Sequence, residues 1–285
     1  MTPARREAGF ALVMVLWTTM IVALIAASVM TMARSDATMS HVRRRAAEQA
    51  ALADAGIDLA ILRLLDLDAA RRPPMDATPF DVWFDGLRMT ARVQDESGKV
   101  DLNAAPGPLL LRLLMSAGLD EATAQTETDR ILDWREPGDL CRLNGAKRED
   151  YRDAGLPYGP RLGPFPAVAE LKLVLGITPD LFARLAPAIT VYSQQSGIDQ
   201  SVAPREALLA LPGLDEAAVD AILLARHPAD ADTAEPGGPA ARQDLSGHAF
   251  TVSATVTQAG SSVTRTAVIR LSGSMQRPIW IYRWE

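Results

Sequence analysis

The chain has 285 residues, is 48% hydrophobic and carries a formal net charge of −6 at pH 7. This length is enough for one or two domains with a sizeable core. The acidic balance does not suit non-specific binding to nucleic acid, which relies on clustered Lys and Arg. The single cysteine, Cys141, excludes an intramolecular disulfide.

The N-terminus joins a short polar leader to a long apolar run. Arg5 and Arg6 precede Gly9, and residues 10–33 contain no charged residue before Arg34. About 20 apolar residues cross the hydrocarbon core of a bilayer. A secretory signal peptide has a shorter apolar region, of ~7–15 residues, and its cleavage site follows that region. We therefore predict a transmembrane helix that a cut after Gly9 would leave on the mature chain.

A leader that ends in Gly and is followed by Phe resembles the class III signal of type IV pilin-like proteins. In that family a prepilin peptidase cuts between the two residues and methylates the new N-terminus, which places the cut between Gly9 and Phe10. An uncleaved signal anchor is the alternative. The positive-inside rule puts Arg5 and Arg6 in the cytoplasm and the bulk of the chain outside, although Arg34 and residues 43–45 argue the other way.

The helical period continues past the apolar run. Apolar residues recur every three or four positions from Met39 to Leu64, and no proline interrupts them before Pro73. We predict one helix that continues as an amphipathic helix to about residue 70 and is stopped by the Arg-Arg-Pro-Pro cluster at 71–74. The amphipathic half needs a surface on which to pack.

Two regions of alternating apolar and polar residues flank a mainly helical stretch. Residues 75–102 predict a β-hairpin with its turn at Asp85-Gly86. Residues 248–285 predict two strands around Ala259-Gly260 and a third strand at the C-terminus.

The stretch between these strands, residues 103–227, contains three helix–turn–helix copies. Each copy has a glycine at its turn, and these are Gly118, Gly176 and Gly213. Residues 228–247 are rich in Pro, Gly, Asp and Ala and predict a flexible loop. The predicted fold class is α+β: a pilin-like long N-terminal helix packed on an antiparallel sheet, with a large all-α domain inserted between strands.

Segments across the whole chain are similar to a known family. They include ALADAGIDLAILRLL, DESGKVDLNAA, ILDWREPGD and LPGLDEAAVDAILLAR. They resemble the minor pseudopilin K of the type II secretion system, also called general secretion pathway protein K. The resemblance implies a single-pass protein of the bacterial inner membrane, with its bulk in the periplasm, that forms the tip of the pseudopilus and supports protein export across the outer membrane.

The same resemblance implies the partners. These are the minor pseudopilins I and J, with pseudopilin H, the major pseudopilin and the prepilin peptidase as further partners. We expect an assembly protein and no enzyme. The alternative is a single-span, membrane-anchored periplasmic binding module that is neither cleaved nor assembled.

Met14 would be the fifth residue of the cleaved chain. Pilins and the major pseudopilin carry a Glu there, and its carboxylate is thought to pair with the N-terminal amine of the neighbouring subunit. A carboxylate in lipid is costly and is kept only where a partner exists. A subunit with no neighbour ahead of it has no such partner, so Met14 fits a tip subunit. An ordinary lipid-facing residue is the alternative reading.

The resemblance also implies a calcium site in the helical insert. The acidic candidates are Asp133, Glu136, Asp139, Glu149 and Asp150. In the family pattern two acidic residues follow Gly-Ala, whereas this chain has Lys147 and Arg148 there. Two cations in place of two carboxylates weaken a calcium site or shift its ligands. The alternative is a solvated loop in which Asp133 and Asp139 cap helices.

No catalytic constellation is visible in the sequence. The histidines are scattered and lie at His41, His227 and His248. No GxSxG, HExxH or P-loop pattern occurs. Arg142 would lower the pKa of the Cys141 thiol beside it, but no second motif supports a nucleophile. We interpret Asp95 and Glu96 as the end of a strand rather than an acid/base pair.

Residues 211–214 are similar to the turn of helix-hairpin-helix motifs, which present backbone N–H groups and basic side chains to phosphate. Asp215 and Glu216 follow this turn and would repel phosphate. We therefore expect a packing role for the turn and no nucleic-acid partner.

Overall fold

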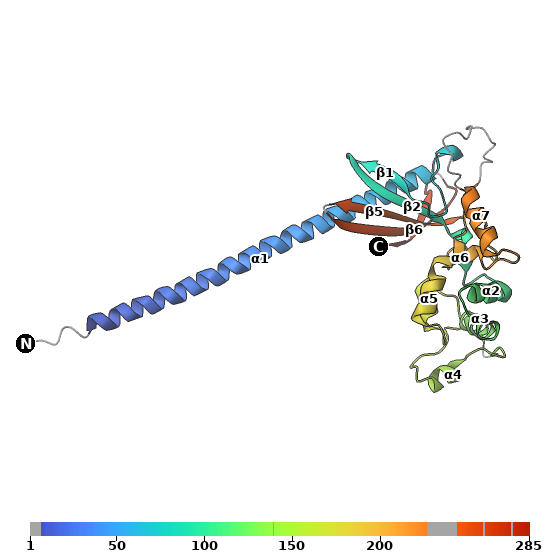
Figure 1. Cartoon of the computed structure of the whole chain (residues 1–285), viewed down its shortest axis with the longest axis horizontal. Coiled ribbons are helices and arrows are strands. Elements are labelled where there is room, and N and C mark those ends of the chain that lie inside the picture. Colours follow the sequence, from blue (N-terminus) through green and yellow to red (C-terminus); the bar gives the residue numbers. More distant parts are fainter. Residues whose placement is uncertain (1–6, 139, 227–243, 259, 275) are drawn as a thin grey trace, which may run out of the picture. The chain divides into compact units, whose positions relative to one another are not determined.

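The computed structural model describes residues 7–138, 140–226, 244–258, 260–274 and 276–285 (Figure 1). The chain forms two compact units, Met1–Leu52 and Ala53–Glu285. A single helix, α1 (Glu7–Leu64), runs through the first unit and into the second. Most of the loop predicted at 228–247 lies outside the described residues.

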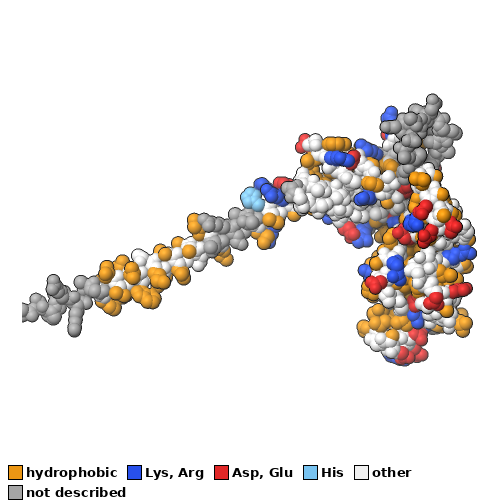
Figure 2. All heavy atoms as spheres, viewed as in Figure 1, with side chains coloured by type: hydrophobic (Ala, Val, Ile, Leu, Met, Phe, Trp, Pro, Cys, Tyr) orange, Lys and Arg blue, Asp and Glu red, His pale blue; other side chains and the backbone are white. Residues whose placement is uncertain are grey.

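The part of α1 in the first unit contains a fully exposed apolar stretch. Phe10–Met30 has 21 residues and a mean hydropathy of 2.5, and none of it is buried. Figure 2 shows hydrophobic side chains along this stretch. The hydroxyls of Thr18, Thr19 and Ser28 donate to carbonyls of the preceding turn at 2.9–3.0 Å. These bonds satisfy the polar side chains within the helix, as a hydrocarbon environment requires.

In the second unit, the last turns of α1 pack on the face of a β-sheet. The buried apolar side chains of these turns are Ala53, Ile57, Ala60, Ile61 and Leu64. Gly56 allows a close approach, because a Cβ there would lie 2.9 Å from Ala254 Cβ and 3.3 Å from Met89 Sδ. Asp54 Oδ1 accepts hydrogen bonds from Arg265 Nε at 2.9 Å and Trp284 Nε1 at 2.7 Å. The predicted amphipathic packing face is therefore present.

The helix ends at Leu64 rather than near residue 70. The reason lies in two aspartates, whose side chains bond to the backbone and compete with the helix. Asp66 Oδ1 accepts from the N–H of Asp68 at 2.9 Å, and Asp68 Oδ1 accepts from that of Ala70 at 3.1 Å. Asp68 thus caps a separate short 3₁₀ helix, Ala69–Arg71.

The sheet has five antiparallel strands in the order β1-β2-β5-β6-β7. Their bounds are Phe80–Phe84, Leu87–Asp95, Ala249–Gln258, Ser261–Leu271 and Ile279–Trp284. The turn between β1 and β2 has positive φ at both Asp85 (49°) and Gly86 (75°), as a two-residue type I′ hairpin requires. The predicted hairpin and the three C-terminal strands are confirmed.

The helical domain is inserted between β2 and β5, which are neighbours in the sheet. Asp95, at the end of β2, faces Phe250 in β5, so the chain leaves and re-enters the sheet at the same end (Figure 1). The inserted helices are α2 (Gly107–Ser116), α3 (Glu121–Arg135), α4 (Arg148–Asp153), α5 (Pro179–Leu185), α6 (Arg205–Leu208) and α7 (Glu216–Arg226). The order predicted from the sequence is therefore confirmed.

Two details of the insert differ from the prediction. The first helix of the middle copy is a 3₁₀ helix, Val168–Leu173. A parallel pair of two-residue strands, β3 (Val100–Asp101) and β4 (Ile189–Thr190), joins the segment just before the insert to the segment between α5 and α6. The turn glycines behave as expected, since Gly118, Gly176 and Gly213 have φ of 95°, 93° and 79°.

Candidate functional site

The acidic residues of the predicted metal site divide between the end of α3 and the loop and helix that follow it. Asp133 lies inside α3, two residues before its end, and its side chain is fully buried. It is therefore not a helix cap, and that alternative is wrong for this residue. Its Oδ1 accepts from Arg142 Nη1 at 2.9 Å, and its Oδ2 accepts from the backbone N–H of Arg142 at 3.1 Å.

Gly145 is placed against the same carboxylate. A Cβ at this position would lie 1.8 Å from Asp133 Oδ2, so no other residue fits without moving the loop. The loop after α3 therefore folds back over Asp133 and closes its carboxylate from solvent.

Two cations fill the space between the acidic groups. Arg142 bridges Asp133 and Glu136, because its Nη2 donates to Glu136 Oε2 at 2.7 Å. Lys147 Nζ donates to the carbonyls of Gly138 at 3.2 Å and Asp133 at 3.4 Å, and lies 3.8 Å from Asp133 Oδ1. Burial acts to lower the pKa of Arg142, but its bonds to Glu136 and Asp133 outweigh burial and raise that pKa.

Of the remaining candidates, Glu149 and Asp150 do not join this cluster. The side chain of Glu149 is 84% exposed, and Asp150 Oδ2 accepts from the backbone N–H of Lys147 at 2.7 Å in the first turn of α4. Asp139 lies outside the described residues. Within the described part of the chain, no group of three or more His, Cys, Asp or Glu side chains gathers as metal ligands would.

Cys141 lies beside this cluster, and the pKa of its thiol shifts in the direction opposite to the predicted one. Its Sγ donates to Asp133 Oδ2 at 3.3 Å. Partial desolvation and then the Asp133 carboxylate raise the pKa of the thiol. The predicted lowering by Arg142 is wrong, because that guanidinium is turned toward Asp133 and Glu136 instead.

A second buried polar cluster lies where the insert joins the sheet. Asp95 ends β2, as predicted, and its Oδ2 lies 2.8 Å from His248 Nδ1. This hydrogen bond raises the pKa of His248. The neighbouring Glu96 Oε1 accepts from Thr251 Oγ1 at 2.7 Å and Lys99 Nζ at 2.8 Å. The pairing of His248 was not predicted, because 153 residues separate it from Asp95.

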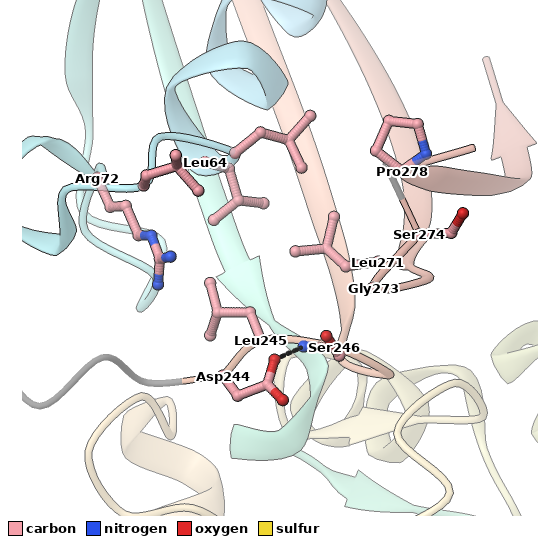
Figure 3. A pocket seen from close by; sticks show the side chains of 11 residues that line it. Leu64, Arg72, Asp244, Leu245, Ser246, Leu271, Gly273, Ser274 and Pro278 are labelled. Atoms are coloured by element: carbon pink, nitrogen blue, oxygen red, sulfur yellow. Dashed lines mark hydrogen bonds between the residues drawn. The ribbon is translucent and has the colours of Figure 1, made fainter. Parts of the chain in front are cut away.

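A cavity of about 360 Å³ lies between the end of α1 and the sheet (Figure 3). Leu64, Leu245 and Leu271 form its apolar wall. Its charged lining residues are already engaged, since Arg72 Nε donates to the carbonyl of Asp66 at 2.9 Å and Asp244 Oδ1 accepts from the N–H of Ser246 at 2.9 Å. Among the described residues that line it, the cavity is therefore an apolar hollow without a catalytic pair.

The residues of the predicted processing site lie in α1 in the first unit. Gly9 and Phe10 are helical, and the side chains of Phe10 and Met14 are 67% and 55% exposed. Cleavage between Gly9 and Phe10, methylation of Phe10 and the role of Met14 stay predictions.

The comparisons with known proteins agree with this architecture. Residues 89–194 match the family model of the type II secretion system (T2SS), protein K. That range runs from β2 through β4 and includes the cluster around Asp133. No curated protein matches the sequence.

A solved structure shares the fold. It is a chain in the crystal structure of the GspK–GspI–GspJ complex from the enterotoxigenic Escherichia coli type 2 secretion system. The TM-score is 0.59 at 15% sequence identity, and the match covers 85% of this chain and 97% of that chain. The sheet and its helical insert are therefore found together in a second protein.

Proposed function

We propose that this chain, whose residues 89–194 match the family model of protein K of the type II secretion system, is the minor pseudopilin at the tip of the periplasmic pseudopilus. It would assemble there with pseudopilins I and J, contact pseudopilin H and the major pseudopilin, and support protein export across the outer membrane. The solved complex that contains a chain of the same fold also contains GspI and GspJ, which motivates the choice of partners.

One observation carries the proposal of a tip position. Residues 53–64 of α1 run along the sheet toward the end at which the insert is attached, since Leu64 lines the same cavity as Leu245 and Leu271. Leu271 ends β6, and Leu245 precedes β5, close to the point of insertion. A bulky helical domain at that end would cover the place where a further pilin-like subunit would stack. This arrangement favours a subunit that caps a fibre.

The N-terminal half of α1 would anchor the protein before assembly. The exposed stretch Phe10–Met30 is long and apolar enough to cross a bilayer. We propose that it crosses the bacterial inner membrane once, with the second unit in the periplasm. A prepilin peptidase would cut between Gly9 and Phe10, and Met14 would need no partner amine at the tip.

We propose that the chain acts by assembly and not by catalysis. The buried carboxylates of Asp95 and Asp133 bond to neighbouring side chains and backbone groups rather than lining an open cavity. Such pairing supports a structural role for these groups.

The test is to express the full chain together with pseudopilins I and J in cells that contain or lack a prepilin peptidase. The chain is then extracted from the membranes of both kinds of cell. Intact mass and the N-terminal residue report processing. We expect a chain that starts at methylated Phe10 only with the peptidase, and that co-purifies with I and J in equal amounts. Gly9→Val should block the cut, while Ala11→Val beside it should not.

The contrary results are equally clear. A chain that starts at Met1 in both strains and purifies alone would support the membrane-anchored binding module instead. A processed chain incorporated along the whole pseudopilus, rather than once per fibre, would overturn the tip position while leaving the membership of the pseudopilus intact.

A further inference from the structure

The end of α3 presents the oxygen atoms that a calcium site uses. Carboxylates and backbone carbonyls are the ligands that Ca²⁺ prefers. Here the Asp133 carboxylate and the carbonyls of Asp133 and Gly138 converge on one point, and Glu136 lies next to them. The donor set alone would therefore suit a divalent cation.

The point on which these oxygens converge is taken by a side chain of the protein. Lys147 Nζ lies 3.2, 3.4 and 3.8 Å from the Gly138 carbonyl, the Asp133 carbonyl and Asp133 Oδ1. A calcium ion needs six to eight oxygens at about 2.3–2.6 Å, so it could not share this point with an ammonium group. The side chain of Lys147 is only 17% exposed, so the ammonium lies within the fold.

Among the residues that the structure describes, the charges that meet at Asp133 also balance without a metal. Asp133 and Glu136 supply two negative charges, and Arg142 and Lys147 supply two positive charges. A divalent cation brought to this neutral cluster would meet two fixed cations within a few ångströms, and like charges at such distances repel strongly in a partly buried site. The described residues of this cluster therefore do not fit calcium.

We propose that Arg142 and Lys147 replace a structural metal ion in this chain. Arg142 ties Glu136 and the following loop to the buried Asp133, and Lys147 ties the carbonyls at the end of α3 to the start of α4. The insert therefore folds and keeps its loop in place without calcium. The proposal concerns the stability of the insert and is independent of where the protein assembles.

The first test uses the full chain in detergent micelles and needs no variant. Thermal unfolding is followed by circular dichroism in excess EDTA and in excess calcium chloride, and calcium binding is measured by equilibrium dialysis. We expect the same Tm in both solutions and no calcium bound. A higher Tm in calcium, or stoichiometric binding, would overturn the proposal.

The second test removes the inner cation. Lys147→Met keeps most of the side-chain length and loses the charge, and Arg148→Met removes a neighbouring charge that is exposed. We expect Lys147→Met to lower Tm by roughly 4–8 °C, on the scale expected when a buried charge loses one of its partners in a domain of this size. Arg148→Met should leave Tm unchanged.

The effect of calcium on Tm should also differ between Lys147→Met and Arg148→Met. Without the ammonium, the freed oxygens of Asp133 and Gly138 can accept a metal ion, so calcium should restore part of the lost Tm in Lys147→Met only. Equal Tm values for the two variants in EDTA would contradict the role of Lys147. An equal response of both variants to calcium would show that the metal acts elsewhere, and would also overturn the proposal.

Discussion

The sheet and the helical insert keep their structure by different means. The sheet buries apolar side chains in alternation along its strands, such as Val252, Ala254 and Val256 in β5. The insert has an apolar core as well, but it also buries charged side chains, among them Asp101, Glu127, Asp129 and Asp133. The difference lies in where the polar backbone groups find their partners.

Strands pair their backbone groups with one another, whereas short helices and loops leave many carbonyls and N–H groups unpaired. α4 and α6 have only six and four residues. Charged side chains supply the missing partners, as when Asp101 Oδ2 accepts from the N–H of Gln194 at 2.7 Å. The insert should therefore respond most to the loss of a single charged group, and the sheet to a change of shape.

The largest effect is expected at Arg135. Its Nη1 and Nη2 donate to the carbonyls of Leu102 at 2.5 Å and Ala105 at 2.7 Å, and burial lowers its pKa. Arg135→Met would leave two carbonyls without a donor, which we expect to lower the free energy of unfolding by about 2–4 kcal/mol. Urea denaturation of the full chain in detergent measures this change in the free energy of unfolding.

The exposed Arg112 in α2 provides the control. Arg112→Met removes the same charge from a helix of the same insert and should change stability by less than about 0.5 kcal/mol. If the two variants were equally stable, the insert would not depend on charged groups and the contrast with the sheet would fail.

The next largest effect is expected where α1 packs closely on the sheet at Gly56. Gly56→Val places a side chain 2.9 Å from Ala254 Cβ and should force α1 away from the sheet. We expect a loss of about 1–3 kcal/mol, the usual cost of overpacking, although Gly is the poorer helix former. Leu62→Val, on the exposed side of the helix, is the control for the introduced valine. An equal or greater stability of Gly56→Val would mean that the helix is not held close to the sheet.

The parts of the fold that the sequence predicted are those that local patterns encode. The alternation in residues 80–93 and the Asp85-Gly86 turn identify the β1–β2 hairpin, and the turn glycines identify the helix pairs of the insert. The β3–β4 pair was missed because each strand has two residues, which is too short for any alternation to be visible.

Of the acidic residues that the sequence predicted for the candidate site, the structure brings Asp133 and Glu136 together, and their shared partner Arg142 was not predicted. The sequence shows Lys147 where the predicted calcium pattern has an acidic residue, yet it does not show that the loop turns back over α3. The bond from Arg142 to Asp133 joins residues nine positions apart, and only the folded loop with Gly145 against the carboxylate brings them together. Pairing of this kind depends on tertiary structure, which no local pattern encodes.

A smaller effect is expected at the junction between the two regions. The pKa of His248 is raised in the folded protein by its bond to Asp95. The resulting stabilisation is complete below the ordinary histidine pKa of about 6.5 and is lost as the pH rises through the raised pKa of the folded state. The free energy of unfolding should therefore fall as the pH rises above about 6.5.

His248→Gln should flatten this pH dependence while keeping a donor near Asp95. Denaturant titrations at several pH values compare it with the unchanged protein. If the free energy of unfolding declined equally in both proteins, the pH dependence would belong to other groups, and the bond of His248 to Asp95 would not stabilise the junction.

The smallest effect concerns Cys141 and reports whether Arg142 is held in the cluster. Because desolvation and the Asp133 carboxylate raise the pKa of this thiol, less of it is thiolate at pH 8 than in the unfolded chain, and thiolate is the reactive form. Alkylation by iodoacetamide, followed by mass spectrometry, should therefore be a few-fold slower in the folded protein than in urea. If the reaction were faster in the folded protein, Arg142 would be directed at the thiol and away from Asp133. The insert would then lack this charge pairing, which is the feature that distinguishes it from the sheet.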